Sequence, residues 1–410
     1  MPVSTALSIR ENQLPARLPS DFMTKFTHTL SRRPKTLEFS LALEDDEPIR
    51  ILHLSDLQFG GFGNWKQKLD ASHCATTIRR RKGWKTGPTF IVITGDVAER
   101  GLPNEYDAAY SWLKEFVSEF GWVLPSSRVL VVPGNHDVCL PFAASSQLTL
   151  QETKDSIARR QSDPKASKDF VVDFASAESS STDLRDFAFR PYLDFCSRIT
   201  PRLFLAPSQD ADRRESSRHS YAWVESRFRH LGVTFFGLNT AQPVQYRTIT
   251  GRSVPRSTIE DIVRETQAIA TDMESPPLVI GLTHHYPLRG QKNWAVEEPE
   301  HFSQLFTDAP RVALWLHGHW HLRETSIMST ARTTGVLVVN SAPSLTVSEG
   351  KRPPDTARGF SMIELSRSEG KIHDCSILPV EWNGPNGLVI REAEGKRFNL
   401  DCHGFFVPAT

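Results

Sequence analysis

Short apolar runs recur along this chain, and most of them end at a polar residue that can bind a ligand. Residues 49–54, 90–93 and 129–132 are such runs, rich in Val, Ile and Leu, with Gly or Pro close by. Runs of this length and composition are typical of strands buried on both faces. Between the last two, residues 105–120 carry apolar side chains at helical spacing. This alternation of strand and helix predicts an α/β fold.

The later part of the chain continues the same pattern and adds antiparallel elements. Residues 221–228 and 233–238 predict a hairpin whose connection contains Gly232. An amphipathic pattern at 257–273 predicts a helix. Further strands are predicted at 278–282, 312–316, 335–340, 360–365 and 371–378. We therefore expect the parallel core to be closed by antiparallel strands.

Three stretches do not follow this pattern, and they set the predicted domain boundaries. Residues 1–36 contain scattered prolines without a clear period, which predicts an N-terminal extension. Residues 141–219 are rich in Ser and charged residues and predict a helical insertion, with one helix near 184–198. Residues 382–410 carry no interpretable pattern and are assigned as a C-terminal tail. The main domain is expected to span residues 37–381.

The composition of the chain argues against several classes of function. Lys+Arg and Asp+Glu both number 48, so no net field attracts nucleic acid or an anionic membrane, and nucleic acid is not a favoured partner. The 5 cysteines lack a Cys-x-x-Cys pair, which indicates reduced thiols instead of a disulfide framework or a zinc knuckle. No stretch approaches the roughly 20 apolar residues of a membrane span. We expect a soluble cytoplasmic protein without a membrane partner.

The polar blocks after the apolar runs supply carboxylate, amide and imidazole groups. In chain order they are Ser55-Asp56-Leu57-Gln58, Gly95-Asp96, Gly134-Asn135-His136-Asp137, His284-His285-Tyr286-Pro287 and His317-Gly318-His319-Trp320-His321. Each block alone is a weak signal, since a Gly-Asp pair is usually a turn. Each nevertheless follows a predicted strand, and a strand directs the loop that leaves it. Together the blocks predict a site for two divalent metals, which can clamp a phosphate and lower the pKa of a bridging water.

The ordered blocks resemble the calcineurin-like metallophosphoesterase superfamily. The motifs of that superfamily are Asp-x-His, Gly-Asp, Gly-Asn-His-Asp/Glu, His and Gly-His-x-His, and the resemblance spans about residues 49–366. The segment 95–101 followed by Glu105-Tyr106 is similar to its cyclic-nucleotide phosphodiesterase branch, as is the His-His-Tyr-Pro block. The resemblance implies two mixed β-sheets flanked by helices, with the metal ligands on loops at one end.

The resemblance also implies roles for individual residues. The first metal would be bound by Asp56, Gln58 and His321, both metals by Asp96, and the second by Asn135, His285 and His319. His285 is chosen within the doublet because Tyr and Pro follow it, so that His284 would support a ligand or simply pack. His136 would face the substrate and stabilise charge or protonate the leaving oxygen, with Asp137 orienting its ring.

Gln58 departs from the superfamily pattern, which has His at this position. It can bind the first metal directly, hold a metal-bound water, or leave the first site weak. A glutamine amide oxygen is a hard donor that suits Mn²⁺ or Mg²⁺ more than Zn²⁺. Some relatives that resemble Mn-dependent ADP-ribose/CDP-alcohol diphosphatases also carry Asp-x-Gln. We expect two divalent ions, Mn²⁺ foremost, with Mg²⁺, Fe or Zn²⁺ as alternatives.

The expected function is hydrolysis of a phosphoester by a metal-activated hydroxide, with a nucleotide-type phosphodiester as substrate. The nucleotide expectation follows from the resemblance alone. Within enzymes, the alternatives are a nuclease and a nucleoside-diphosphate-linked pyrophosphatase. From another class, the chain could be a metal-binding scaffold with weak catalysis that uses the insertion at 141–219 to bind a partner.

Overall fold

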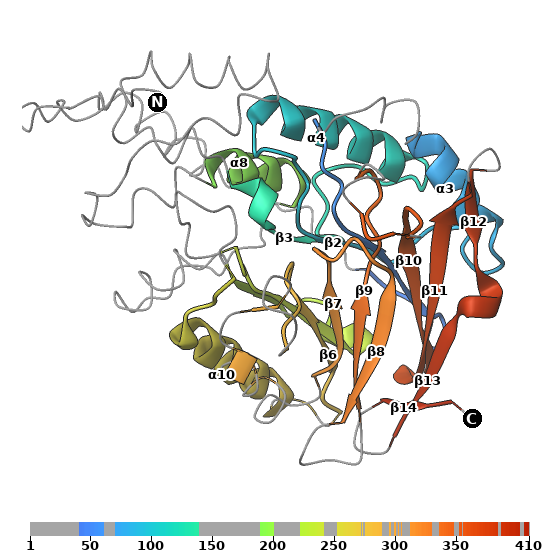
Figure 1. Cartoon of the computed structure of the whole chain (residues 1–410). Coiled ribbons are helices and arrows are strands. Elements are labelled where there is room, and N and C mark those ends of the chain that lie inside the picture. The colour runs from blue at the N-terminus through green and yellow to red at the C-terminus, as the bar shows by residue number, and fades with distance from the viewer. Residues whose placement is uncertain are drawn as a thin grey trace, which may run out of the picture.

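The strands of the molecule form two mixed half-sheets that face each other, with helices outside them (Figure 1). This computed structural model describes residues 41–60, 70–138, 189–200, 222–241, 252–271, 273, 275–288, 295–296, 299–300, 302, 305, 312–329, 336–347, 352–354, 356–383, 387–401 and 406–409. The N-terminal extension predicted at 1–36 and most of the predicted insertion at 141–219 lie outside these residues.

The first half-sheet is built on three parallel strands. Its hydrogen-bonded order is β3 (Val129–Val132), β2 (Phe90–Thr94), β1 (Ile49–Leu54), β10 (Gly359–Ser368), β11 (Lys371–Trp382) and β13 (Lys396–Leu400), with β12 (Leu388–Ile390) attached to β11. β1, β2 and β3 are parallel, whereas β10 and β11 run antiparallel to their neighbours. All residues of β1 to β3 are buried, as their continuous apolar runs predict.

The second half-sheet has a similar plan. Its order is β4 (Trp223–Glu225), β5 (Val233–Gly237), β6 (Leu278–Leu282), β7 (Val312–His317), β9 (Val336–Ser341) and β8 (Glu324–Ser329). β5, β6, β7 and β9 are parallel to one another. β4 and β8 pair antiparallel at the two edges. The predicted hairpin before Leu238 is confirmed as the β4–β5 pair, which a 3-10 turn at Arg229–Leu231 connects.

The C-terminal residues form strands although their sequence carries no clear pattern. β13 pairs with β11, β14 (Phe406–Pro408) pairs with β13, and Phe406 of β14 pairs with Val336 of β9. Hydrogen bonding therefore continues from one half-sheet to the other along this edge. The prediction of two mixed sheets flanked by helices is confirmed. The assigned tail is integrated into the sandwich, because pairing stabilises short strands whose own pattern is weak.

The helices flank the two half-sheets separately. α3 (Ala71–Arg80), α4 (Pro103–Ser118) and α8 (Arg190–Ile199) lie along the first half, and α10 (Arg256–Thr271) lies beside the second (Figure 1). α4 buries one face that includes Tyr106, Leu113 and Phe116. α10 places Ile259 and Ile262 in a second apolar cluster with residues of the second half-sheet. No helix in the described part of the chain is long and apolar enough to cross a membrane.

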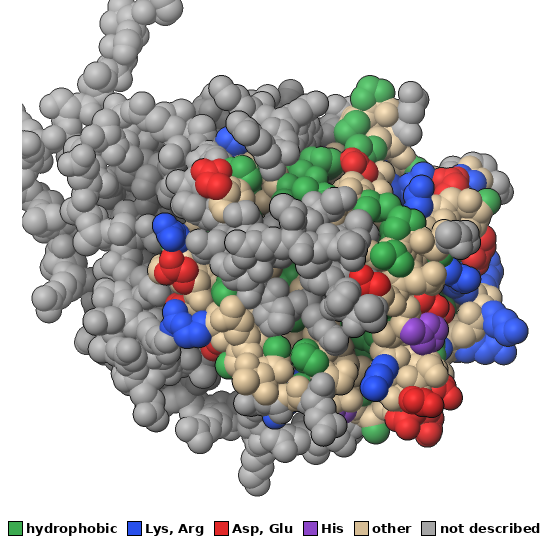
Figure 2. Space-filling model, turned by 90° about the horizontal axis from the view of Figure 1, so that it is seen from below, with side chains coloured by type: hydrophobic (Ala, Val, Ile, Leu, Met, Phe, Trp, Pro, Cys, Tyr) green, Lys and Arg blue, Asp and Glu red, His purple; other side chains and the backbone are tan. Residues whose placement is uncertain are grey.

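Charged side chains of both signs are interspersed on the face drawn in Figure 2. Neither sign dominates the described residues of that face, which agrees with equal numbers of acidic and basic residues in the sequence.

Aromatic rings join the two half-sheets in the interior. The ring of Phe90 in β2 packs edge-on against that of Phe235 in β5, with centroids 5.0 Å apart, and against Phe228 at 4.7 Å. Phe90 and Phe235 are both fully buried. This contact helps hold the two half-sheets together across the interior.

We expect Phe235→Ala to lower the free energy of unfolding by about 3–5 kcal/mol, because it removes a buried ring and leaves a cavity. The measurement is the urea unfolding midpoint followed by tryptophan fluorescence. Ile327→Ala is the control, since Ile327 is 47% exposed and its loss should cost less than about 1 kcal/mol. Equal costs at the two positions would contradict this account of the interior.

Candidate metal centre

The polar blocks lie in loops that leave the carboxyl ends of the parallel strands. Asp56 follows β1, Asp96 follows β2 and Asn135 follows β3 in the first half. In the second half, the His284-His285 doublet follows β6 and His319 follows β7. Because parallel strands in one sheet end at the same edge, the packing of the two halves brings both sets of loops together. The residues that the sequence places far apart thus form one cluster.

The backbone of this cluster is unusual. Among the described residues other than glycine, positive φ occurs at Glu369 and at five of the predicted metal ligands. Those five are Asp56, Gln58, Asp96, His319 and His321, with φ between 40° and 68°. A left-handed conformation costs a non-glycine residue of order 1–3 kcal/mol and persists where the surrounding structure or a function requires it. The concentration of such residues here marks a functional site.

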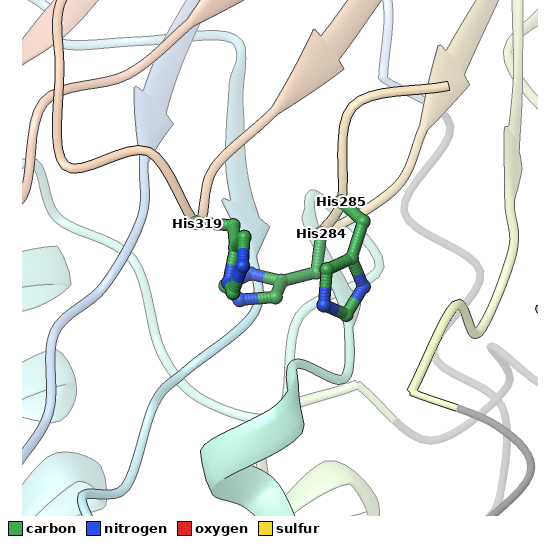
Figure 3. Close-up of side chains that lie close together, drawn as sticks. All are labelled: His284, His285 and His319. Atoms are coloured by element: carbon green, nitrogen blue, oxygen red, sulfur yellow. The ribbon is translucent and has the colours of Figure 1, made fainter. Parts of the chain in front are cut away.

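Two groups of donors have ligand atoms close enough to hold metal ions. One group is Asp56, Asp96 and His321, and the other is His284, His285 and His319, in each case with ligand atoms within 4.8 Å of one another. Figure 3 shows the second group, in which the ring of His319 faces the rings of the doublet. The two groups share a boundary, because His284 Nε2 lies 3.3 Å from Asp96 Oδ2. Asp96 therefore contacts both groups.

Asp56 organises the first group. Its Oδ1 lies 3.0 Å from His321 Nε2, and its Oδ2 accepts hydrogen bonds from Ser55 Oγ at 2.7 Å and His319 N at 3.1 Å. The Asp56 side chain is fully buried. This arrangement links the loop after β1 to the loop after β7, so that one carboxylate positions both His319 and His321.

The doublet presents its two imidazoles differently. His284 Nδ1 donates to Thr94 O at 2.7 Å, and its Nε2 lies 3.1 Å from Asn135 Oδ1. His285 Nδ1 lies 2.9 Å from Thr240 Oγ1. Their rings are 5.1 Å apart, and that of His285 is 4.3 Å from the ring of His319. His284 therefore contacts two residues of the proposed second site and does not merely pack behind it.

Several buried polar atoms in the cluster have no hydrogen bond. They are His285 Nε2 and two carboxylate oxygens, Asp56 Oδ1 and Asp96 Oδ2, which have only the ion-pair contacts with His321 and His284 described above. Buried polar atoms are nearly always satisfied, since an unmet group costs of order 1–3 kcal/mol. Carboxylate oxygens and an imidazole nitrogen are donors for divalent metals. The residues present thus fit the binding of such ions, which would satisfy the atoms that hydrogen bonding leaves open.

The charge balance of the cluster leads to the same conclusion. Burial alone would raise the pKa of Asp96, but His284 and His136 hold it well below its usual value. Burial alone would lower the pKa of His284, but Asp96 and Asp56 raise it to about 9. Burial, His319 and His284 lower the pKa of His285. The buried carboxylates therefore attract positive charge, and divalent cations would supply it.

Two glycines of the motifs allow loops to approach closely. A Cβ on Gly318 would lie 1.8 Å from Ser55 Oγ, and one on Gly134 would lie 2.2 Å from Asp96 Oδ1. Both distances are far below van der Waals contact, so any side chain at either position would displace a carboxylate-bearing loop. The glycines in the motifs are therefore required by packing of the site itself.

His136 and Asp137 do not form the pair that the sequence suggests. His136 Nδ1 lies 2.6 Å from Glu99 O, so a backbone carbonyl orients the ring. Asp137 instead accepts hydrogen bonds from Gly134 N at 2.9 Å, Ala98 N at 3.1 Å and Tyr106 Oη at 2.8 Å. The expectation that Asp137 orients the His136 ring is wrong. The backbone carbonyl of Glu99, in the loop after β2, orients the His136 ring instead.

Asp137 joins the loops after β2 and β3. Its carboxylate is completely buried, and burial together with Asp96 raises its pKa to about 6. The bond from Tyr106 connects this carboxylate to α4. Asp137 therefore holds the backbone of the loops that carry Asp96 and His136, and it does not contact either side chain as a partner in these bonds.

Gln58 lies in the cluster, with a backbone fixed by its neighbours. It is 4% exposed, and its N donates to Asp96 O at 2.8 Å. Ser344 Oγ donates to the backbone O of Asp56 at 2.9 Å from the opposite side. The loop that carries Asp56 and Gln58 is thus held by the second block and by the segment after β9.

Comparison with known proteins agrees with this geometry. The family model for calcineurin-like phosphoesterases matches residues 49–323, more than half of the chain. The chain belongs to the calcineurin-like phosphoesterase family. Members of this family are metallophosphoesterases with a dinuclear metal centre, so the two adjacent donor groups have a counterpart in the family.

Solved structures of similar fold have very different sequences. A dimetal phosphatase from Danio rerio has 12% identity, with 84% of this chain and 99% of that chain covered and a TM-score of 0.41. The inner membrane complex anchor GAP50 of Plasmodium has 14% identity, covers 84% and 88%, and has a TM-score of 0.46. No curated protein matches the sequence. At these identities the likeness concerns the fold alone.

Three contacts that orient the imidazoles of the site come together only in the folded chain. Thr94, Glu99 and Thr240 each orient an imidazole of the site through a carbonyl or hydroxyl oxygen. Carbonyl groups carry no sequence signal, and a threonine at a strand end is common. The position of Thr240, three residues after the end of β5, is the one hint that the sequence offered, because β5 ends at the same edge as the ligand-bearing strands.

The two imidazoles of the doublet can be separated by mutation. We expect both His284→Ala and His285→Ala to weaken Mn²⁺ binding, by roughly 10–100-fold each, because each ring contributes to the same donor group. The measurement is calorimetric titration of metal-free protein. His230→Ala serves as the control, since His230 is exposed and bonds to Leu41 O and Arg227 O instead. Unchanged affinity in His284→Ala would show that only His285 is a ligand.

Proposed function

We propose that the chain is a metal-dependent phosphodiesterase that acts on a nucleotide-type substrate. The observation that carries the proposal is the pair of donor groups that meet at Asp96, with buried oxygens and an imidazole nitrogen left without hydrogen bonds. Membership of the calcineurin-like phosphoesterase family supports phosphoester hydrolysis. The phosphodiester and nucleotide preferences extend the resemblance of the second and fourth blocks to the cyclic-nucleotide branch.

We propose that Asp56, Gln58 and His321 hold the first ion and that Asp96 bridges to the second. Asn135, His319 and the His284-His285 doublet would hold the second ion. When bound, two divalent cations supply Lewis acidity toward phosphate oxygens and acidify water. Gln58 would supply a hard amide oxygen where the family has an imidazole, which favours Mn²⁺ or Mg²⁺ over softer ions. Mn²⁺ is the ion we propose.

His136 is suited to act on the substrate. Its Nδ1 donates to Glu99 O, which leaves Nε2 as the ring nitrogen that can act on a substrate. Its backbone N donates to Asp96 Oδ1 at 2.8 Å, so the ring is held beside the proposed metal centre. A protonated Nε2 can stabilise charge on a phosphate oxygen or pass its proton to the leaving alkoxide. Unlike His284, His136 is only partly buried, which leaves it accessible to a substrate.

Asp96 provides the direct test of metal-dependent hydrolysis. Metal-free protein should regain hydrolysis of an aryl phosphodiester when Mn²⁺ is added, and Asp96→Asn should lower the rate by roughly 10³-fold or more, since it removes the charge shared by both ions. Turnover measured with excess Mn²⁺ is the readout. Asp45→Asn, at an exposed position, should behave as the wild type. Failure of every divalent metal to restore turnover would favour the scaffold hypothesis.

A substrate panel tests the narrower part of the proposal. We would compare kcat/KM for cyclic nucleotides, single- and double-stranded DNA and ADP-ribose. Cyclic nucleotides are expected to be the best of the panel. Preference for DNA would support a nuclease, and preference for ADP-ribose would support a nucleoside-diphosphate-linked pyrophosphatase.

Gln58 provides a separate test of the metal preference. Gln58→His replaces a hard amide oxygen with an imidazole, so we expect the ratio of Zn²⁺ to Mn²⁺ affinity to rise on the order of tenfold, or about 1.4 kcal/mol. Competition titration of metal-free protein measures this ratio. An unchanged ratio would mean that the Gln58 side chain does not touch the first ion.

A further inference from the structure

A buried polar cluster lies behind the metal centre, between the two half-sheets. It consists of His53 in β1, Thr94 at the end of β2 and Asn340 in β9, each with 0% exposure. None of these residues belongs to the proposed ligand set. Burying polar groups in an otherwise apolar interior is unfavourable unless each is hydrogen-bonded. The cluster therefore calls for a role that an apolar residue could not fill.

Asn340 connects the second half-sheet to the first. Its Nδ2 donates to His53 Nδ1 at 3.0 Å and to Ser361 Oγ at 3.3 Å. Its Oδ1 accepts a hydrogen bond from Thr325 Oγ1 in the edge strand β8 at 3.0 Å. His53 and Ser361 are direct partners across β1 and β10. The Asn340 amide thus forms hydrogen bonds to two neighbouring strands, β1 and β10, of the opposite half-sheet.

This amide also determines the tautomer of His53. Because Nδ1 accepts from Asn340, the hydrogen is on Nε2, which donates to Thr94 Oγ1 at 2.9 Å. Burial, with the neighbouring His317, lowers the pKa of His53 to about 3, so the ring is neutral and can donate at one nitrogen while it accepts at the other. Hydrogen bonds therefore run in one direction from Asn340 through His53 to Thr94.

Thr94 continues the connection to the site. Its backbone O accepts from His284 Nδ1 at 2.7 Å and lies 3.1 Å from Ser55 Oγ. Ser55 Oγ is also 2.7 Å from Asp56 Oδ2. Thr94, whose hydroxyl is bonded to His53, thus orients the His284 imidazole of one donor group. Its carbonyl also contacts the loop that carries Asp56 of the other group.

We infer that His53 is a positioning residue: by bonding Thr94, it sets the carbonyl that aims His284 at Asp96 and Asn135. The inference rests on the proposed function, since it assigns His53 a role in binding the second ion. It adds a cross-sheet connection, from β9 through β1 to the end of β2, that keeps the two sets of loops in register. An apolar residue of equal volume would fill the space at position 53 without aiming the carbonyl.

Two substitutions of His53 each keep one of its two side-chain hydrogen bonds and test them separately. In His53→Gln, the amide nitrogen lies near the position of Nε2 and can still donate to Thr94. In His53→Asn, the amide oxygen lies near the position of Nδ1 and can accept from Asn340, but the side chain is too short to reach Thr94. His230→Gln is the control for loss of an imidazole at an exposed position.

The Thr94 hydroxyl allows the same question to be asked from the other side. Thr94→Val keeps the shape and removes the hydroxyl that accepts from His53, whereas Thr94→Ser keeps the hydroxyl. Both variants retain the backbone carbonyl of residue 94, so any effect on metal binding must come from a change in the position of that carbonyl. This second pair decides the matter if a His53 variant does not fold.

The measurement is Mn²⁺ titration of metal-free protein by calorimetry, with electron paramagnetic resonance to detect the coupled ion pair. Wild type is expected to bind two ions per chain. His53→Asn and Thr94→Val should bind one of them roughly 10–100-fold more weakly and lose the coupled signal. His53→Gln and Thr94→Ser should remain within about threefold of wild type, on the same scale.

The possible outcomes distinguish a failure of the proposed metal centre from a failure of the role assigned to His53. If wild type binds no Mn²⁺, the proposed metal centre is wrong and this inference falls with it. If wild type binds two ions and His53→Asn or Thr94→Val binds them equally well, only the positioning role is wrong. A loss that is the same in His53→Gln as in His53→Asn would also overturn it, because the bond to Thr94 would then not be what matters.

Discussion

Two buried carboxylates, Asp56 and Asp96, impose the constraint on which the site depends. Their negative charges lie in the same interior cluster, where water cannot screen them. The protein surrounds them with imidazoles and backbone N–H groups, and still leaves one oxygen of each without a hydrogen bond. Such an arrangement is costly for an empty cavity and favourable around divalent cations. The cluster is therefore best understood as a site built for positive charge.

The rest of the fold brings these carboxylates and their partners together and holds them there. Parallel strands in both halves end at the same edge, and glycines at 134 and 318 let the loops approach to distances that a Cβ would prevent. Left-handed backbone at five predicted ligands stores strain that the interior must offset. The cross-sheet bonds from Asn340 to His53 and Ser361 connect β9 of one half to β1 and β10 of the other.

Prediction from sequence succeeded where the chemistry is local and failed where partners come from elsewhere in the chain. Asp56, Asp96 and the last histidine block were found because each follows an apolar run, and the structure brings them together. The partner of the His136 ring was assigned wrongly, because a neighbouring carboxylate is conspicuous in sequence and the carbonyl of Glu99 is not. For His284 the sequence left open a role in supporting a ligand or simple packing, and the structure places it against Asp96 and Asn135.

The sequence by itself determined the strand and helix pattern, the types of donor and the family, because these depend on residues close together in the chain. Only the tertiary structure decided which donors meet, which nitrogen of His285 is left without a hydrogen bond, and that the C-terminal residues complete the sandwich. Such outcomes depend on contacts between distant segments, as when Asn340 reaches His53 across the interior. Their free energy comes from packing and from satisfying buried polar groups, neither of which is visible along the chain.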